Sequence, residues 1–421
     1  MFTAFFRDRR TLKNCKIYQM LSFHAKKRHL SFHTPGHKIG KWDITELSFS
    51  DNLSAPRGVL ADAQKDIAQI LGAERSFILT DGSTCGILSM LQASKTLGVK
   101  TLLAIEPLHK SVYNACATLG LQLITAPSFV ADNALLQNVQ AVLLTSPDYY
   151  GNVADLAYVK NICNKTGTLL LVDGAHGGHL HYNKILHAGA YADMWVDGVH
   201  KSLPALTQGA VVSANERCAA ALEQAVDIFR TTSPSYPIMA SVEYAVKYPQ
   251  NPALENAVRD FAKQTERVFV RQDYTKLCAL FGKNAFLAEK HLEKQGIYAE
   301  FCDGNVLCFY LSPAQKISDF QVLKRALTKA FTLYPNIQEK QTQRIPAPTV
   351  FIKNTATEWV ELAKSERRIC AGNCGLFPPC TPLLYTGEQI CAEHIRLLKS
   401  ANNVFGINNG KILVYCEQEK E

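Results

Sequence analysis

Short apolar runs alternate with longer amphipathic segments between residues 60 and 250. The runs have the length and aliphatic content of buried strands, and they are Ser76–Thr80, Thr101–Ile105, Ala141–Thr145, Leu169–Val172, Met194–Val196 and Gly209–Ser213. The amphipathic segments have helical spacing, and they are Leu60–Gly72, Ile87–Ala93, Asn114–Leu119, 155–166 and Ile238–Lys247. This alternation predicts an α/β fold in which helices cover a mostly parallel sheet.

The pattern changes near residue 250. Two long amphipathic helices are expected at Ala253–Val270 and Ile317–Phe331, around a strand at Val306–Leu311. This order of elements predicts a second, smaller α+β domain. We therefore expect three parts, which are an amino-terminal arm (residues 1–45), a large domain (46–248) and a small carboxy-terminal domain (249–421).

An acid and a lysine follow two of the predicted strands. Asp173 comes directly after Leu169–Val172, and Lys201 follows Met194–Val196 in a tight connection before the next strand. Open α/β sheets bind ligands at the carboxyl ends of their strands. Most pairs of this kind are a strand cap and a solvated cation, but the pair also suits pyridoxal phosphate (PLP) chemistry. There the lysine amine forms a Schiff base, and the aspartate keeps the pyridine nitrogen protonated.

A small-residue turn lies between the first predicted strand and the next helix. It reads Asp81-Gly-Ser-Thr-Cys-Gly86 and places the hydroxyls of Ser83 and Thr84 near the start of a helix. Free backbone N–H groups at a helix amino terminus attract anions, so this turn is a candidate phosphate site. The commoner alternative is a plain connection in which Ser or Thr caps the helix.

Composition excludes several other classes of protein. The chain has 421 residues, of which 47% are hydrophobic and 19% charged, as in globular proteins large enough for two domains. The net charge of +8 lies largely in the first forty-one residues, without a pattern typical of nucleic-acid binding. No apolar stretch is long enough to span a bilayer, and the amino terminus does not resemble a signal peptide. Thirteen scattered cysteines fit reduced thiols, so a cytoplasmic protein without a metal site is expected.

Several separated motifs together resemble one family. They are Thr34-Pro-Gly-His-Lys38, Asp81–Gly86, His109-Lys-Ser111, Thr145-Ser-Pro147, Leu171-Val-Asp-Gly-Ala-His-Gly-Gly-His179, Val199-His-Lys-Ser-Leu-Pro-Ala-Leu-Thr-Gln208 and Thr232-Ser-Pro-Ser-Tyr236. Their order resembles the ornithine/lysine/arginine decarboxylases, in the compact branch that lacks a wing domain. The resemblance implies the aspartate aminotransferase fold (fold type I) and PLP-dependent decarboxylation of a basic amino acid, which yields an amine of the polyamine type. It also implies a homodimer, or a higher even oligomer, in which two subunits share each active site.

The resemblance assigns roles to individual residues. It implies a catalytic set of Lys201, Asp173, His109 and His200. Within this set His109 stacks on the cofactor ring, and Lys201 or His200 returns a proton to the substrate carbon. The cofactor-binding set that it implies is Ser83, Thr84, His109, Asp173, His176, His200, Lys201 and Thr232, with Thr232 reaching the phosphate of the neighbouring subunit.

Other readings stay open at this point. His176, His179 and His181 lie close to Asp173 in sequence, and such a cluster could hold a metal that activates water. A metal site would give no functional role to Lys201. The same lysine and aspartate would also serve transamination or elimination. A weakly active or non-catalytic paralogue with a regulatory role is the alternative outside catalysis.

The chain departs from the family pattern near the expected site. The departures are Glu106 for an arginine, Asp148 for a threonine, Gly174 for a glutamate, and Gly198-Val199 for Ser-Thr. A serine hydroxyl at position 198 would donate to a charged phosphate, a bond worth about 1.5–3 kcal/mol. Its loss predicts cofactor affinity that is weaker by about tenfold or more. The choice among arginine, lysine and ornithine is open, with Glu106, Asp148 and Glu388 as candidate partners for the substrate's cationic end.

Overall fold

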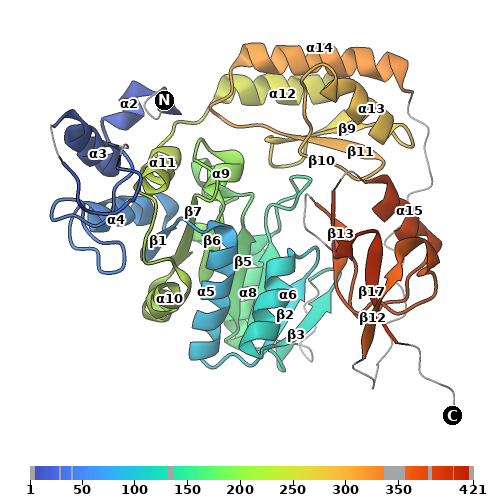
Figure 1. Ribbon diagram of the computed structural model, residues 1–421, viewed down its shortest axis with the longest axis horizontal. Helices are drawn as coiled ribbons and strands as arrows, with labels where there is room; N and C mark the ends of the chain where they lie inside the picture. Colours follow the sequence, from blue (N-terminus) through green and yellow to red (C-terminus); the bar gives the residue numbers. More distant parts are fainter. Residues whose placement is uncertain are drawn as a thin grey trace. The chain divides into compact units, whose positions relative to one another are not determined.

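A seven-stranded sheet forms the centre of the first part of the chain (Figure 1). The computed structural model describes residues 5–27, 30–38, 41–129, 136–335, 356–377, 382–401 and 403–416. The strand order is β1-β7-β6-β5-β4-β2-β3, with parallel pairing from β6 to β3 and antiparallel pairing at β1 and β7. The strands are β1 (Arg75–Leu79), β2 (Thr101–Ile105), β3 (Gln122–Ala126), β4 (Ala141–Thr145), β5 (Leu169–Gly174), β6 (Met194–Asp197) and β7 (Ala210–Ala214).

Helices cover this sheet and lie beside its first strand. They are α2 (Arg9–Leu12), α3 (Lys16–Lys26), α4 (Val59–Leu71), α5 (Gly82–Thr96), α6 (Lys110–Leu119), α8 (Leu156–Thr166), α9 (Val199–Ser202), α10 (Glu216–Phe229) and α11 (Tyr236–Val246). Helices α5 and α10 pack side by side along the sheet (Figure 1). Strands β5, β6 and β7 are buried at every position, so their sequences are largely apolar runs, and β5 and β6 end in Asp173-Gly174 and Asp197.

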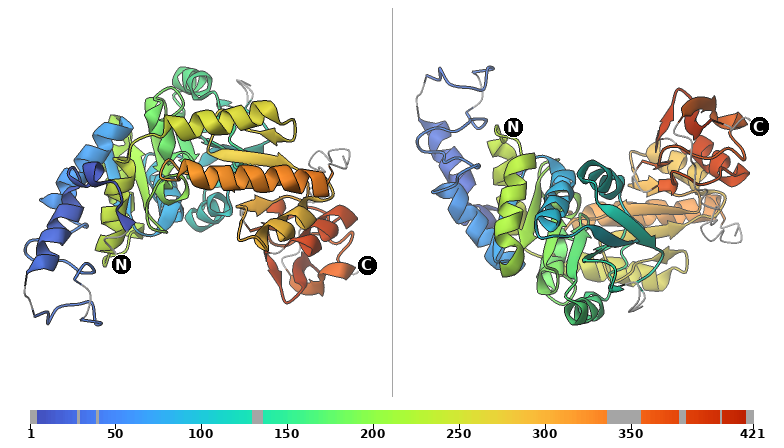
Figure 2. Two further views of the ribbon diagram at one scale, coloured as in Figure 1. Left: turned by 90° about the horizontal axis from the view of Figure 1, so that it is seen from above. Right: turned by 90° about the horizontal axis from the view of Figure 1, so that it is seen from below.

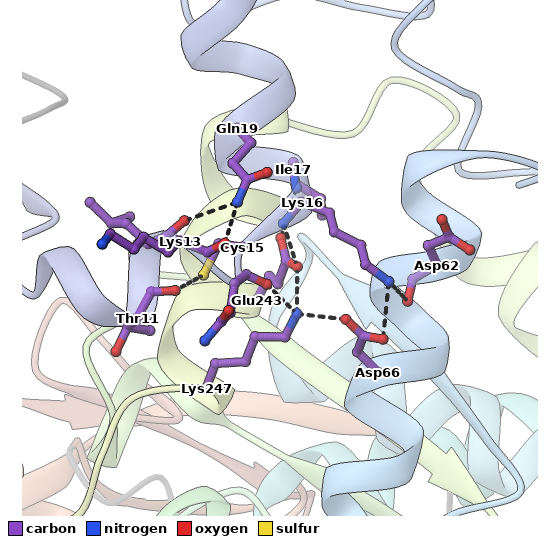
Figure 3. A network of polar contacts seen from close by, with 12 residues as sticks. Thr11, Lys13, Cys15, Lys16, Ile17, Gln19, Asp62, Asp66, Glu243 and Lys247 are labelled. Carbon is purple, nitrogen blue, oxygen red and sulfur yellow. Dashed lines mark hydrogen bonds and ion pairs between the residues drawn. The ribbon is translucent and has the colours of Figure 1, made fainter.

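The amino-terminal helices are tied to α11 by a buried carboxylate. Glu243 accepts the backbone N–H groups of Lys16 and Ile17, both over 2.8 Å, and so caps α3, where Cys15 gives no side-chain cap. Lys247 Nζ bridges Glu243 (2.8 Å) and Asp66 of α4 (2.7 Å), as Figure 3 shows. Helices α3 and α4 pack against α11, and both views of Figure 2 show the blue amino-terminal helices beside yellow-green helical segments. The start of the chain is therefore an integral layer of this unit.

The chain divides into two compact units. The first comprises Met1–Pro107, Ser111–Ala253 and Leu311–Gln315, and the second comprises Leu108–Lys110, Leu254–Tyr310 and Lys316–Glu421. In the second unit a four-stranded antiparallel sheet has the order β10-β11-β9-β8. Its elements are α12 (Pro252–Gln264), β8 (Val268–Phe269), β9 (Lys276–Leu280), α13 (Ala285–Glu293), β10 (Phe301–Cys302), β11 (Val306–Tyr310) and α14 (Ile317–Leu333).

The carboxy-terminal segment adds two small three-stranded sheets and one helix to the second unit. The elements are β12 (Thr357–Glu361), β13 (Cys374–Leu376), β14 (Pro382–Leu384), α15 (Ala392–Ser400), β15 (Val404–Phe405), β16 (Ile407–Asn408) and β17 (Lys411–Tyr415). They enclose a small core of their own that includes Leu384, Ile390 and Ile412. Among the helices of the described ranges, none combines the length and the apolar character that crossing a lipid bilayer requires.

The predicted α/β fold with a mostly parallel sheet is confirmed, and several boundaries match closely. Strands β2 and β4 and the helix before Gly167 lie where the apolar pattern placed them, and Gly72 ends α4 in the left-handed conformation at φ 74°. The single helix expected over Ala253–Val270 is wrong beyond Gln264, because Val268 and Phe269 pair with β9 instead.

Two helices also begin earlier than expected. Helix α5 begins at Gly82 rather than at Ile87, and α6 begins at Lys110 rather than at Asn114. The first turns of both helices are rich in polar residues, so they lack the apolar spacing from which the helices were predicted. The division at residues 45 and 248 stays a prediction.

Candidate active site

Two neighbouring parallel strands carry the acid and the lysine at their carboxyl ends. Asp173 lies at the end of β5 and is paired in register with Val196 of β6. After β6 the chain turns at Gly198 and forms the four-residue helix α9, which presents Lys201. Both side chains therefore start from the same edge of the sheet. The tight connection expected around Lys201 is one helical turn.

The Lys201 amine lies beside a buried imidazole. Its Nζ is 3.1 Å from Nε2 of His176, which follows β5 and is 4% exposed. The ring of Tyr149 packs edge-on against His176, with 4.8 Å between the ring centroids. Because Tyr149 is itself buried, it fixes the plane of this imidazole. The lysine amine is thus oriented by a ring that cannot easily turn.

Asp173 is a desolvated carboxyl group. It is 3% exposed, and the Ala175 N–H donates to its Oδ1 over 3.0 Å. Burial raises the pKa of Asp173; the charge of Lys201 and the bond from Ala175 oppose this rise, and the charge of Asp197 adds to it. Its ionised form is therefore stabilised by any cation placed beside it. A protonated ring nitrogen would be such a cation.

The first turn of α5 meets the connection between β6 and α9. The Oγ atom of Ser83 is buried and has no hydrogen-bond partner among the described residues. Asp81, at the N-cap of α5, makes no side-chain cap bond, so the N–H groups of this turn keep their capacity for an anion. Thr84 is exposed one residue further on. These features fit a phosphate group.

His200 precedes the lysine and faces the backbone of the next strand. Its Nδ1 donates to the carbonyl of Gly209 over 2.9 Å, which leaves Nε2 as the acceptor of the neutral ring. Burial lowers the pKa of His200, the Gly209 bond opposes this, and the charge of Lys201 lowers it further. His200 is therefore a neutral imidazole at pH 7.

Two predicted site residues lie in other surroundings. His109 is half-buried between β2 and α6, in the segment Leu108–Lys110 that belongs to the second unit. Thr232 is exposed in the turn before α11. The N–H of its neighbour Thr231 donates to Oδ2 of Asp81 over 3.5 Å, so this turn lies beside the start of α5. The roles predicted for His109 and Thr232 stay predictions.

The backbone leaves no room for side chains at two of the departures from the family pattern. A Cβ atom at Gly198 would lie 2.4 Å from the Ala175 carbonyl and 2.7 Å from Ser83 Oγ. A Cβ atom at Gly174 would lie 2.8 Å from the Val196 carbonyl. The Ser83 hydroxyl thus occupies space that the side chain of a serine at position 198 would need. Glycine at these positions allows the close approach of the neighbouring strand ends.

Asp148, a candidate partner for the substrate's cationic end, is occupied within its own loop. Its Oδ1 accepts the N–H groups of Tyr150 and Asn152, both over 2.9 Å, and its Oδ2 accepts the Asn152 amide over 2.6 Å. Both oxygens of Asp148 therefore already accept hydrogen bonds. As to the metal alternative, no group of three or more His, Cys, Asp or Glu in the described ranges is placed to hold a metal ion.

Sequence reasoning missed two groups that lie close to the site. Asp197 is a second buried carboxylate, and His187 lies 3.3 Å from its Oδ2. The signal for Asp197 was present, because it follows the apolar run Met194–Val196 just as Asp173 follows Leu169–Val172. His187 gave no comparable signal, since it stands alone in a loop.

The fold and these residues together define a class of protein. A mostly parallel seven-stranded sheet with a lysine and a buried aspartate at adjacent strand ends is that of PLP-dependent enzymes of fold type I. A family model described as Orn/Lys/Arg decarboxylase, major domain, matches residues 41–124 and 121–279, which is more than half of the 421 residues. The chain belongs to the Orn/Lys/Arg decarboxylase family, whose members are PLP-dependent decarboxylases.

Individual relatives span nearly the whole chain. The uncharacterized protein YaaO of Bacillus subtilis (strain 168) is 27% identical over 479 residues, covering 97% of this chain and 100% of YaaO. An arginine decarboxylase of the same strain is 26% identical over 455 residues, covering 90% and 92%. The constitutive lysine decarboxylase of E. coli matches with a TM-score of 0.71 at 17% identity, over 96% of this chain and 82% of that one. At this identity the structural likeness shows the fold.

Proposed function

We propose that this chain decarboxylates a basic amino acid (arginine, lysine or ornithine) with PLP as its cofactor. The observation that carries the proposal is the placement of Lys201 Nζ beside His176, one strand end from the buried Asp173. Membership of the family and the similarity to an arginine decarboxylase support this reaction class.

The residues of the first unit fit the cofactor at three points. When bound, PLP supplies a protonated pyridine ring that takes up the electrons left by departing carbon dioxide. Lys201 would hold the aldehyde carbon, and Asp173 would hold the proton on the ring nitrogen. Ser83 and the first turn of α5 would bind the phosphate, since the Ser83 hydroxyl is buried and lacks a partner within the described ranges.

Decarboxylation requires a proton at the carbon that loses its carboxylate. Lys201 and His200 are the two candidate donors. Because the pKa of His200 is lowered, through burial first and through Lys201 as well, its ring is unprotonated near neutral pH. We therefore assign proton return to Lys201, with His176 orienting its amine over 3.1 Å.

We further propose that the active site is completed in a homodimer. Thr232 is exposed, as a residue that reaches a phosphate in a second copy of the chain has to be. His109 is assigned to the face of the cofactor ring. Light scattering of the purified protein would give the mass of a dimer, and a monomer with full activity would contradict this arrangement.

Carbon dioxide release is the direct test of the activity. The purified chain, supplied with PLP, would be offered arginine, lysine and ornithine separately. The Lys201→Ala variant would serve as the test variant and Lys165→Ala as its matched control, because Lys165 is exposed in the last turn of α8. We expect release from at least one amino acid by the wild type and by the control, and none by Lys201→Ala. A keto acid without carbon dioxide would mean transamination and would overturn the proposal.

A further inference from the structure

A second buried carboxylate lies one strand from Asp173. Asp197 ends β6, is 1% exposed, and is paired in register with Gly174 of β5. None of the roles proposed above uses it. A buried acid that has no structural partner for one of its oxygens requires a reason.

One oxygen of Asp197 is well held. Trp195 Nε1 donates to Oδ2 over 3.0 Å, and Nε2 of His187 lies 3.3 Å from the same oxygen. The Gly189 N–H donates to Nδ1 of His187 over 3.2 Å, so Nδ1 carries no proton. In the neutral ring the proton is therefore on Nε2, and it points to Asp197. Trp195 and His187 therefore both direct an N–H group at Oδ2 of Asp197.

The other oxygen of Asp197 has no such donors in the described part of the chain. Oδ1 of Asp197 is buried, and no donor among the described residues reaches it. It lies 3.1 Å from the point that a Cβ atom of Gly174 would occupy, so glycine at position 174 makes the space into which this oxygen projects. Gly174 directly follows Asp173, which places the charge of Asp197 behind the carboxyl that would bind the ring nitrogen.

The charge of Asp197 acts on its neighbour. Burial and the charge of Asp197 both raise the pKa of Asp173, while Lys201 opposes them. His179 and His181 are further titratable groups nearby, and the ring centroid of His181 is 6.4 Å from that of His187. Burial lowers the pKa of His181 to about 4, so it is neutral above pH 5 and adds no positive charge there.

We propose that Asp197 is a positioning residue that retains the proton shared by Asp173 and the cofactor's ring nitrogen. This inference rests on the proposed binding of PLP. A negative charge behind the pair stabilises the bound proton wherever it lies between the two atoms. Asp197 thus extends the pH range in which the ring can accept electrons. His187 and Trp195 keep that charge in place.

The test measures the proton directly. The ¹⁵N chemical shift of bound PLP, labelled at the ring nitrogen, would be followed against pH in the wild type, in Asp197→Asn and in His187→Gln. We expect Asp197→Asn to lose the ring proton about tenfold more easily, at a pH lower by roughly one unit. His187→Gln keeps the charge of Asp197 and is expected to titrate like the wild type. The kcat of Asp197→Asn should fall at alkaline pH with KM unchanged.

Each outcome decides the inference. A purely structural role for Asp197 would lower the melting temperature or the PLP affinity but would leave the titration midpoint in place, and an unchanged midpoint overturns the proposal. If Asp197→Asn does not fold, Asp197→Ser removes the same charge with a smaller side chain and is titrated instead. A wild type that binds PLP but releases no carbon dioxide contradicts only the proposed decarboxylation, since the titration does not depend on turnover.

Discussion

Two buried aspartates, Asp173 at the carboxyl end of β5 and Asp193 just before the amino end of β6, differ in the hydrogen bonds that they accept. Asp193 precedes β6 at the amino end of the sheet and accepts bonds from Lys160 (2.7 Å), Arg217 (2.7 Å), Asn215 (2.7 Å) and the Leu170 N–H (2.7 Å).

By contrast, the Ala175 N–H is the one hydrogen-bond donor to Asp173 in the described ranges. Burial raises the pKa of Asp173, and the net shift is upward. Burial acts on Asp193 in the same direction, but its bonds from Arg217, Leu170 and Lys160 outweigh burial and lower its pKa. The acid whose bonds are all made stabilises the fold, and the acid whose bonds are missing is available for a ligand.

The largest expected effect comes from neutralising Asp173. Asp173→Asn keeps the shape of the side chain but cannot hold a proton on a ring nitrogen, so kcat should fall by roughly 10³-fold. The cofactor-free variant should melt at a higher temperature than the wild type, because a desolvated charge has been removed. Activity assays and thermal melts of the same preparation check both parts. A less stable variant with normal turnover would reverse the contrast between the two acids.

Removal of Asp193 should lower stability and leave turnover unchanged, the opposite of what is expected for Asp173→Asn. Asp193→Ala leaves Lys160 and Arg217 without their buried partner, and hydrogen bonds to a charged group are worth about 1.5–3 kcal/mol each. Chemical denaturation should show this loss. The turnover of the molecules that remain folded should be close to that of the wild type, since Asp193 lies at the far end of the sheet from Lys201. A selective loss of kcat would contradict a structural role.

The two acids should also respond differently to pH. Because the folded pKa of Asp193 is depressed, its contribution is complete above its unfolded pKa, near 3.8, and is lost as the pH falls through the lower folded value. Because the folded pKa of Asp173 is raised, its desolvation weakens the cofactor-free fold as the pH rises above the unfolded value, until the folded pKa is passed. Unfolding curves between pH 3 and 7 test this. Asp193→Asn should reduce the loss of stability at low pH, and Asp173→Asn should not.

A smaller effect is expected where the amino-terminal helices meet α11. Glu243 resembles Asp193 in having its bonds made, with N–H donors from Lys16 and Ile17 and the Lys247 amine (Figure 3). Glu243→Gln should cost about 1.5–3 kcal/mol, the value of hydrogen bonds to a charged group. Faster proteolysis within residues 5–27 would accompany this loss. Unchanged stability would mean that this carboxylate contributes little to holding α3.

The sequence could predict the sheet because its strands are buried on both faces and read as apolar runs. It could also place Asp173 and Lys201 at neighbouring strand ends. It could not distinguish Asp173 from Asp193, because the donors to Asp193 come from Lys160 and Arg217, which only the folded chain brings together. The place of Asp197 at the end of an apolar run is visible in the sequence, but its pairing with Gly174 appears only in the folded chain.

The covalent attachment point of the cofactor shows whether Lys201 is the residue that holds it. The chain would be incubated with PLP, reduced with borohydride and digested, and the peptides would be mapped by mass spectrometry. We expect a cofactor-derived mass on Lys201, which disappears in Lys201→Ala. Lys276 is the sharpest internal control, because it is fully buried with Asp273 3.2 Å away in the second unit. A label on Lys276, or none on Lys201, would contradict the account.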